Sequence, residues 1–166
     1  MFRDKRGYTL IELIVVVLLI GLVLTLTAPR LRDSLLSDDL KSAARRLIGI
    51  TNDLRNEAIR EQRDYFLHLD LDRGRFWITH GSMSEDERAL AAEKGSNLPP
   101  RVNIRDVWIR GKGKVTGGEA RIGFTRRGYT QESVVHLNSQ DGRDLTLILS
   151  PFMGRVKIVD KYVGFD

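Results

Sequence analysis

The chain begins with a long apolar stretch in which a single position is charged. From Tyr8 to Ala28 most residues are Leu, Ile or Val, and Glu12 is the only charged one. If these residues form a helix, it is about 31 Å long, close to the thickness of a bilayer hydrocarbon core. A charged side chain in such a segment costs about 2.5–3.5 kcal/mol on insertion scales and is a functional-site hypothesis by default. We therefore predict a transmembrane helix over residues 8–29 with Glu12 as its functional charge.

After Pro29 the pattern becomes amphipathic. Apolar residues recur at steps of three and four, which predicts one buried stripe on a helix over residues 30–64. Because proline cannot donate to the helical hydrogen-bond ladder, we expect Pro29 to kink or locally break the helix. The stripe comprises Leu40, Ala43, Ala44, Leu47, Ile50, Leu54 and Ala58.

Alternating apolar and polar residues then predict strands over residues 65–166, interrupted by an exposed loop at 80–100. That loop contains a short helical pattern near residues 85–94, and Asp72-Arg73-Gly74 predicts a hairpin turn. We expect about seven strands, antiparallel by hairpin logic, with residues 111–118 as a hairpin tip. The segments are 65–70, 75–79, 102–109, 120–125, 129–137, 145–149 and 155–159. The predicted class is α+β, a long N-terminal helix whose second half packs on an antiparallel β domain.

The first seven residues carry three basic side chains and one acidic one, directly before the apolar run. Basic residues on this flank hold it in the cytoplasm. A secretory signal has the same order, but a cut near Ala28 would place large Leu26 and then Pro29 at the cleavage site. A cut after Gly7 is the alternative, and it would leave the amine of Tyr8 near Glu12. Thr9 and Glu12 also fit a capping box, which would explain the carboxylate by local helix chemistry alone.

The run from Gly7 to Glu12 (GYTLIE) resembles the leader junction of type IV pilins and type II secretion pseudopilins. This resemblance implies that a prepilin peptidase cuts between Gly7 and Tyr8, that residues 1–7 are a leader, and that Tyr8 becomes N-methylated. It also implies a bacterial inner-membrane protein with one span, a cytoplasmic N-terminus before processing and a periplasmic C-terminal domain. The family often has a proline where Pro29 stands.

Residues 43–59, together with the Ile122-Gly123-Phe124 and Gly154-Arg155-Val156 segments, resemble the general secretion pathway protein H family of minor pseudopilins. That resemblance implies a structural subunit of the pseudopilus, which helps to export folded proteins. Its implied partners are other pseudopilins in a filament, the prepilin peptidase, the inner membrane and the inner-membrane assembly platform. The FimT minor pilins, which bind DNA for uptake by a type IV pilus, share the same scheme and are the alternative.

The composition of the chain limits the kinds of functional site that it can form. There are no cysteines, and without residues 1–7 the net charge of +5 falls to +3, from 24 basic and 21 acidic residues. The three histidines lack metal-ligand spacing, and we interpret His68 and His136 as ordinary strand residues. Asp64, Asp70 and Asp72 fit a hairpin turn better than a cation site. We therefore expect no enzyme activity, no cofactor and no metal.

A basic region at residues 101–127 supports the alternative function. It has eight basic residues against Asp106 and Glu119, with aromatic residues nearby. Such a surface would bind a nucleic-acid backbone if its cations shared one face, and the candidates are Arg121, Arg126 and Arg127. The competing interpretation is a solvated surface over core aromatics.

Overall fold

The computed structural model describes residues 10–152 and 155–165, without the side chains of residues 24–38. By its internal contacts the chain divides into two compact units, Met1–Leu35 and Leu36–Asp166. Helix α1 (Leu10–Glu61) runs through both and is helical at Pro29. One helix through Pro29 agrees with the sequence reading, and the kink expected there remains a prediction.

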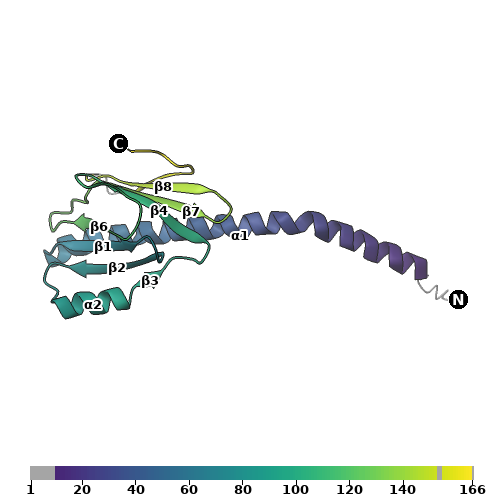
Figure 1. Ribbon diagram of the computed structural model, residues 1–166, viewed down its shortest axis with the longest axis horizontal. Helices are drawn as coiled ribbons and strands as arrows, with labels where there is room; N and C mark the ends of the chain where they lie inside the picture. Colours follow the sequence, from purple (N-terminus) through teal and green to yellow (C-terminus); the bar gives the residue numbers. More distant parts are fainter. Residues whose placement is uncertain (1–9, 153–154, 166) are drawn as a thin grey trace, which may run out of the picture. The chain divides into compact units, whose positions relative to one another are not determined.

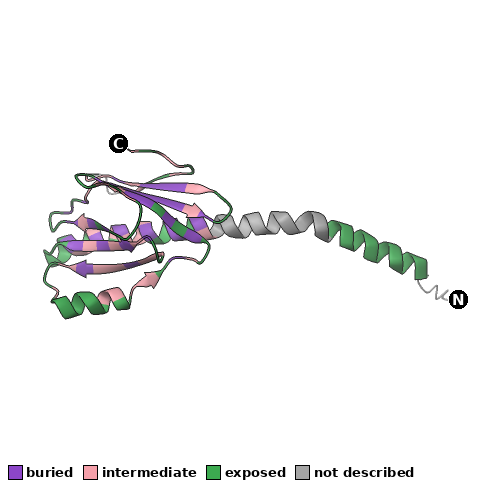
Figure 2. Cartoon of the chain, in the orientation of Figure 1, coloured by how far each residue is buried: buried purple, intermediate pink, exposed green. Residues whose placement is uncertain are grey.

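The second part of α1 buries the predicted stripe. Leu47 and Leu54 are 3% and 1% exposed, and the other members are also buried, except Ile50, which packs partly buried against the core. The prediction of an amphipathic helix is therefore confirmed. Figure 2 shows the alternation of buried and exposed residues along this part of α1.

One sheet contains four strands in the order β3-β2-β1-β6. Its strands are β1 (Tyr65–Asp70), β2 (Arg75–His80), β3 (Ser96–Asn97) and β6 (Glu119–Phe124). All three pairings are antiparallel, and β1 and β2 form the predicted hairpin. Tyr65, Leu67 and Leu69 face the core, while Phe66 and His68 lie on the outer face.

The second sheet contains five antiparallel strands in the order β5-β4-β7-β8-β9, of which Figure 1 labels β4, β7 and β8. Its strands are β4 (Val102–Ile109), β5 (Gly113–Val115), β7 (Ser133–Ser139), β8 (Asp144–Leu149) and β9 (Lys157–Val159). The α1 stripe and the inner faces of both sheets share one core. Leu47 of α1, Leu67 of β1 and Val135 of β7 line the same small internal space.

Two sequence expectations about the sheets are wrong. Residues 111–118 do not join two neighbouring strands, because β5 turns back on β4 and the chain then crosses to the other sheet as β6. Residues 126–128 form a tight turn, in which the Thr125 amide donates to the carbonyl of Tyr129 and Phe124 bridges to Thr130, before the chain continues into β7 of the second sheet. The described residues therefore contain nine strands instead of about seven. The alternating pattern gives each strand its buried face but not its neighbour.

The loop predicted at residues 80–100 contains the expected short helix, α2 (Glu85–Glu93). Ser84 and Glu87 cap its start reciprocally, since the Ser84 hydroxyl accepts from the Glu87 amide and the Glu87 carboxylate accepts from the Ser84 amide. This hydrogen bonding lowers the pKa of Glu87. The strand β3, which follows α2 and pairs with β2, was not expected.

Tyr65, the first residue of β1, should make the free energy of unfolding depend on pH in the alkaline range. Its hydroxyl donates to Glu61 at 2.7 Å, and burial together with this bond raises the pKa of Tyr65 to about 12. The pKa is higher in the folded state, so this contribution to stability is complete below about pH 10 and is lost as the pH rises towards 12. We expect the urea midpoint to fall over this interval, and to fall less in Tyr65→Phe. Equal falls in both proteins would contradict the assignment.

Candidate functional site

The predicted cleavage and methylation site, Gly7 and Tyr8, lies outside the described residues, as does Thr9 of the predicted capping box. Glu12 lies within them, in the first turn of α1. At this end of a helix the dipole favours a negative charge. The role of Glu12 in assembly remains a prediction.

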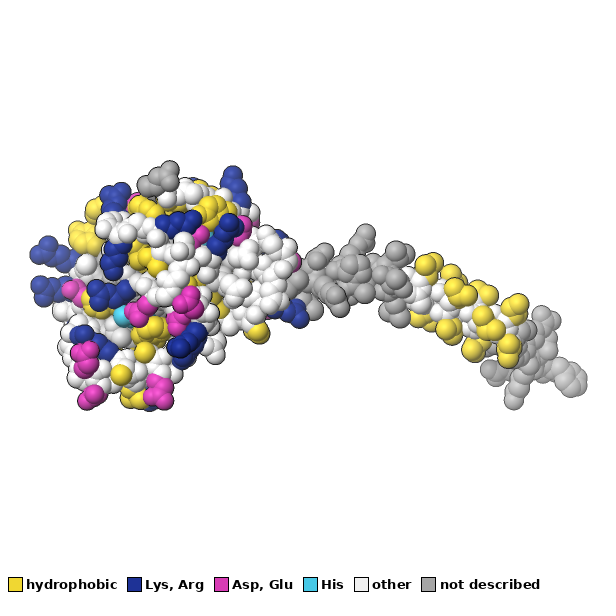
Figure 3. All heavy atoms as spheres, viewed as in Figure 1, with side chains coloured by type: hydrophobic (Ala, Val, Ile, Leu, Met, Phe, Trp, Pro, Cys, Tyr) yellow, Lys and Arg dark blue, Asp and Glu magenta, His cyan; other side chains and the backbone are white. Residues whose placement is uncertain are grey.

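Around Glu12 the helix exposes a continuous apolar surface. Leu10 is 80% exposed, Ile11 71% and Leu13 62%, and the large apolar residues from Ile14 to Val23 are about half exposed or more. Figure 3 shows hydrophobic side chains on this whole described section of α1. A surface of this size and character marks contact with another protein or with a membrane. In the part of the chain that the structure describes, no helix is long and apolar enough to span a membrane.

The basic residues of region 101–127 are distributed over both sheets. Arg105 pairs with Asp144 at 3.1 Å, and Arg110 pairs with Glu132 at 2.6 Å. Arg121 belongs to the other sheet, where its guanidinium lies 4.8 Å from the ring centre of Phe66.

Arg126 and Arg127 occupy the turn after β6, beside the end of α1, where the Arg126 amide donates to Asp64. The basic residues of region 101–127 thus lie on two sheets and on a turn, and the nucleic-acid role of Arg121, Arg126 and Arg127 stays a prediction.

The three aspartates considered as a cation site accept backbone hydrogen bonds instead. Asp70 accepts from the amides of Asp72 and Arg73 in the β1–β2 turn. Asp72 accepts from the Gly118 amide, and Asp64 from that of Arg126. The hairpin-turn interpretation is therefore confirmed for Asp70.

A buried polar centre lies on the outer face of the second sheet. His136 of β7 and Asp106 of β4 are 1% and 2% exposed, with 2.7 Å between Nδ1 and the Asp106 carboxylate. The Nε2 atom lies 2.8 Å from the carbonyl oxygen of Val163. A carbonyl can only accept, so Nε2 carries a proton, and a second proton must lie between Nδ1 and the carboxylate. His136 is a strand residue, as expected, but a fully buried one paired with a carboxyl group.

This centre holds the C-terminal segment, residues 160–165, against the sheet. Tyr162 stacks on His136 with 4.2 Å between ring centres, and Lys114 donates to its hydroxyl at 2.8 Å. Hydrogen bonding to Tyr162, reinforced by the charge of Asp106 3.5 Å away, raises the pKa of Lys114. Thr146 donates to the carbonyl of Lys161. The segment covers β7 and β8, which explains why both faces of these strands are buried.

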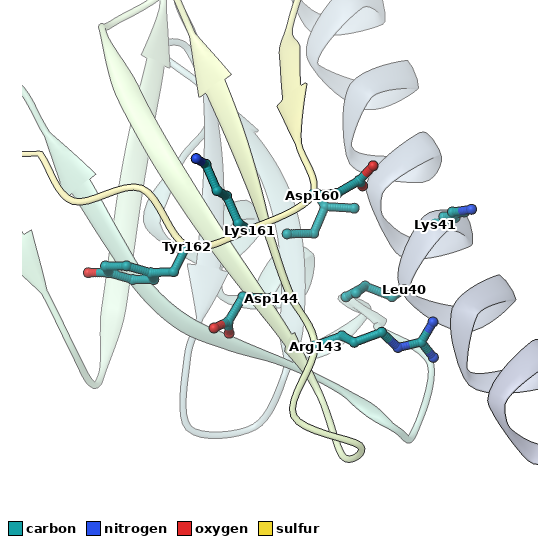
Figure 4. Close-up of a pocket in the computed structure, with 8 residues that line it drawn as sticks. Leu40, Lys41, Arg143, Asp144, Asp160, Lys161 and Tyr162 are labelled. Carbon is teal, nitrogen blue, oxygen red and sulfur yellow. The ribbon is translucent and has the colours of Figure 1, made fainter.

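An open groove of about 450 Å³ separates α1 from this C-terminal segment. Figure 4 shows Leu40 and Lys41 of α1 on one side and the β7–β8 turn with residues 160–162 on the other. Its charges are mixed and partly paired within the chain, since Arg143 contacts Asp141 and Asp144 contacts Arg105.

Comparison with known proteins gives the family. Residues 2–28 match the prokaryotic N-terminal methylation motif. The type II secretion system protein H of Pseudomonas aeruginosa is 39% identical over 157 residues, which cover 93% of this chain and 84% of that protein. The chain belongs to the type II secretion system protein H family. The resemblance seen in the sequence is therefore confirmed.

Solved structures agree on the fold of this family. A crystal structure of the minor pseudopilin EpsH from the type II secretion system of Vibrio cholerae matches with a TM-score of 0.53 at 11% identity. The match covers 77% of this chain and 98% of that one. A second structure of the same pseudopilin gives 0.52 at 13% identity, covering 74% and 98%. The α+β class is confirmed.

Sequence reasoning missed the centre formed by Asp106 and His136. The two residues are thirty positions apart, and the second partner of the histidine is a backbone carbonyl. The only available signal was Asp106 itself, a charged residue at a position that the alternation of β4 assigns to one face among apolar neighbours.

Proposed function

We propose that this chain is a minor pseudopilin, a non-enzymatic structural subunit of the periplasmic pseudopilus of a type II secretion system, which helps to export folded proteins. The observation that carries the proposal is its 39% identity to a type II secretion system protein H over nearly its whole length. The methylation motif and the apolar surface of α1 support it, because a filament subunit needs both a processed N-terminus and a helix that packs against neighbours. The DNA-uptake alternative has less support, because the basic residues of 101–127 are distributed over two sheets and a turn.

The proposal assigns a role to each part of the chain. Residues 1–7 are the leader, and residues 8–29 hold the subunit in the inner membrane and then in the filament. Residues 30–64 join this helix to the periplasmic β domain, residues 65–166. Its partners are the other pseudopilins, the prepilin peptidase and the inner-membrane assembly platform.

Processing tests the N-terminal part of this proposal. We expect the peptidase to cut between Gly7 and Tyr8, because a basic leader and Glu12 flank that bond. Intact-mass analysis of the protein from membranes should give a chain that begins at Tyr8 and is one methyl group heavier than its sequence. A chain that retains Met1, or one that begins at Pro29, would refute this processing.

A further inference from the structure

An exposed aromatic pair lies where α1 ends. The rings of Tyr129 and Phe152 meet edge to face with 5.4 Å between centres, and the residues are 46% and 79% exposed. Ile59 of α1, 45% exposed, lies beside the same turn, since a Cβ on Gly128 would come within 2.8 Å of its Cδ1 atom. Large apolar side chains left in water at one place mark a contact surface.

The turn that presents Tyr129 is well fixed. Gly128 has a φ of +82°, which glycine adopts without strain, and its amide donates to Thr125. The Thr125 amide donates to the carbonyl of Tyr129, and the Arg126 amide donates to Asp64. The aromatic side chain therefore stands on a preorganised support, which lowers the entropic cost of using it in binding.

Two arginines flank the pair and have no acidic partner among the described residues. Arg126 and Arg127 are exposed, and no carboxylate of the described residues pairs with either guanidinium, whereas nearby Arg110 pairs with Glu132. Beside Tyr129 lies an open hollow of about 460 Å³, which Thr125 and Pro151 also line. Aromatic anchors with arginine are the composition typical of binding hot spots.

We propose that this surface, formed by Ile59, Arg126, Arg127, Tyr129 and Phe152, binds the globular domain of a different pseudopilin through an apolar pocket bordered by carboxylates. The inference rests on the proposed function and adds where the neighbour docks. An isologous contact with a second copy is disfavoured, because it would bring the same unpaired arginines together. A nucleic-acid backbone is a poorer fit, since two free cations supply few phosphate contacts while the aromatic pair supplies the area.

The test is co-purification of the tagged full-length chain from membranes of its native host, with the other pseudopilins of that system quantified by mass spectrometry. We expect Phe152→Ala and the double variant Arg126→Glu/Arg127→Glu each to reduce their recovery about tenfold or more, as loss of a hot spot does. Both changes are at exposed side chains, so thermal unfolding should be unchanged. The matched controls are Leu90→Ala, which removes an exposed apolar side chain of α2, and Lys112→Glu, which reverses an exposed charge elsewhere.

Wild-type recovery in both surface variants would refute the docking surface and leave the proposed function intact. A wild-type chain that recovers no other pseudopilin would overturn the proposed function and the inference with it. Recovery of only further copies of this chain, or salt-sensitive binding of duplex DNA that the Arg126 and Arg127 changes abolish, would replace the proposed partner.

Discussion

Replacing Glu12 by Ala should remove the subunit from its assembled complexes while leaving its fold and its insertion into the membrane intact. The carboxylate is the only charge in the apolar run, and processing at Gly7 would create a cationic amine four residues before it. When two subunits meet, the carboxylate and the amine leave their surroundings together and compensate each other's charge. Because the two groups meet in only one alignment of the helices, the pair specifies the register of the helices. Removal of the carboxylate lowers the cost of insertion by about 2.5–3.5 kcal/mol but takes away the partner of the amine.

The measurement is chemical cross-linking in cells, followed by detection of this chain in complexes with other pseudopilins. We expect loss of those complexes in Glu12→Ala and also in Glu12→Gln, whose side chain is uncharged. The second variant separates pairing from helix capping, because glutamine serves equally well in a capping box. Normal incorporation of both variants would contradict the pairing and leave Glu12 as a local cap.

Replacing His136 by Ala should destabilise the β domain by about 3 kcal/mol, since removal of one partner from a buried pair leaves Asp106 with only Lys114, 3.5 Å away, to compensate its charge. Asp106 would lose the bond at 2.7 Å and Val163 the donor to its carbonyl. The stacked ring of Tyr162 would lose its support, so residues 160–165 should also exchange their amide hydrogens faster. Residues 30–166 keep every core residue and suit a urea titration of the free energy of unfolding.

His68→Ala is the matched control. This histidine also bonds through both ring nitrogens, to Glu119 and Thr79, but it lies on the outer face of the other sheet and Glu119 remains half exposed. We expect a smaller loss there, about 1–2 kcal/mol for the two hydrogen bonds. Asp106→Asn keeps the shape of the side chain and should cost less than His136→Ala. Equal and small losses in the free energy of unfolding for His136→Ala and His68→Ala would show that the buried pair contributes no more to stability than a partly exposed histidine does.

The helices were the most predictable part of the fold, because helical periodicity is a local property. The stripe from Leu40 to Ala58 and the short helix near residues 85–94 were both predicted, and both are present. The hairpin of β1 and β2 was equally clear from its turn.

The assignment of strands to sheets was not predictable in this way. The alternation of apolar and polar residues in β4 and β6 shows which side chains are buried but not which strands pair. The strand β5, which lies between them in the sequence, is too short to show an alternating pattern. In β7 the alternation disappears, because the C-terminal segment covers the face that would otherwise be solvated.

The candidate functional residues also differ in how far the sequence predicts them. Glu12 can be recognised from the sequence because the residues next to it in the chain are apolar. The surface around Tyr129 and Phe152 forms only when two segments that are distant in the sequence meet. The cations of residues 101–127 are contiguous in sequence, but β4 and β6 belong to different sheets. A run of like charge in the sequence therefore does not by itself show that its members share one surface.

The central claim is that this chain is a subunit of a type II secretion system. Measuring protein export in a host strain that lacks the chain tests this claim most directly. Culture supernatant and periplasm would be compared by mass spectrometry, with and without the wild-type chain supplied in trans. The account predicts that substrates of the type II system accumulate in the periplasm and return to the supernatant on complementation. Unchanged export, accompanied by loss of DNA uptake, would contradict it.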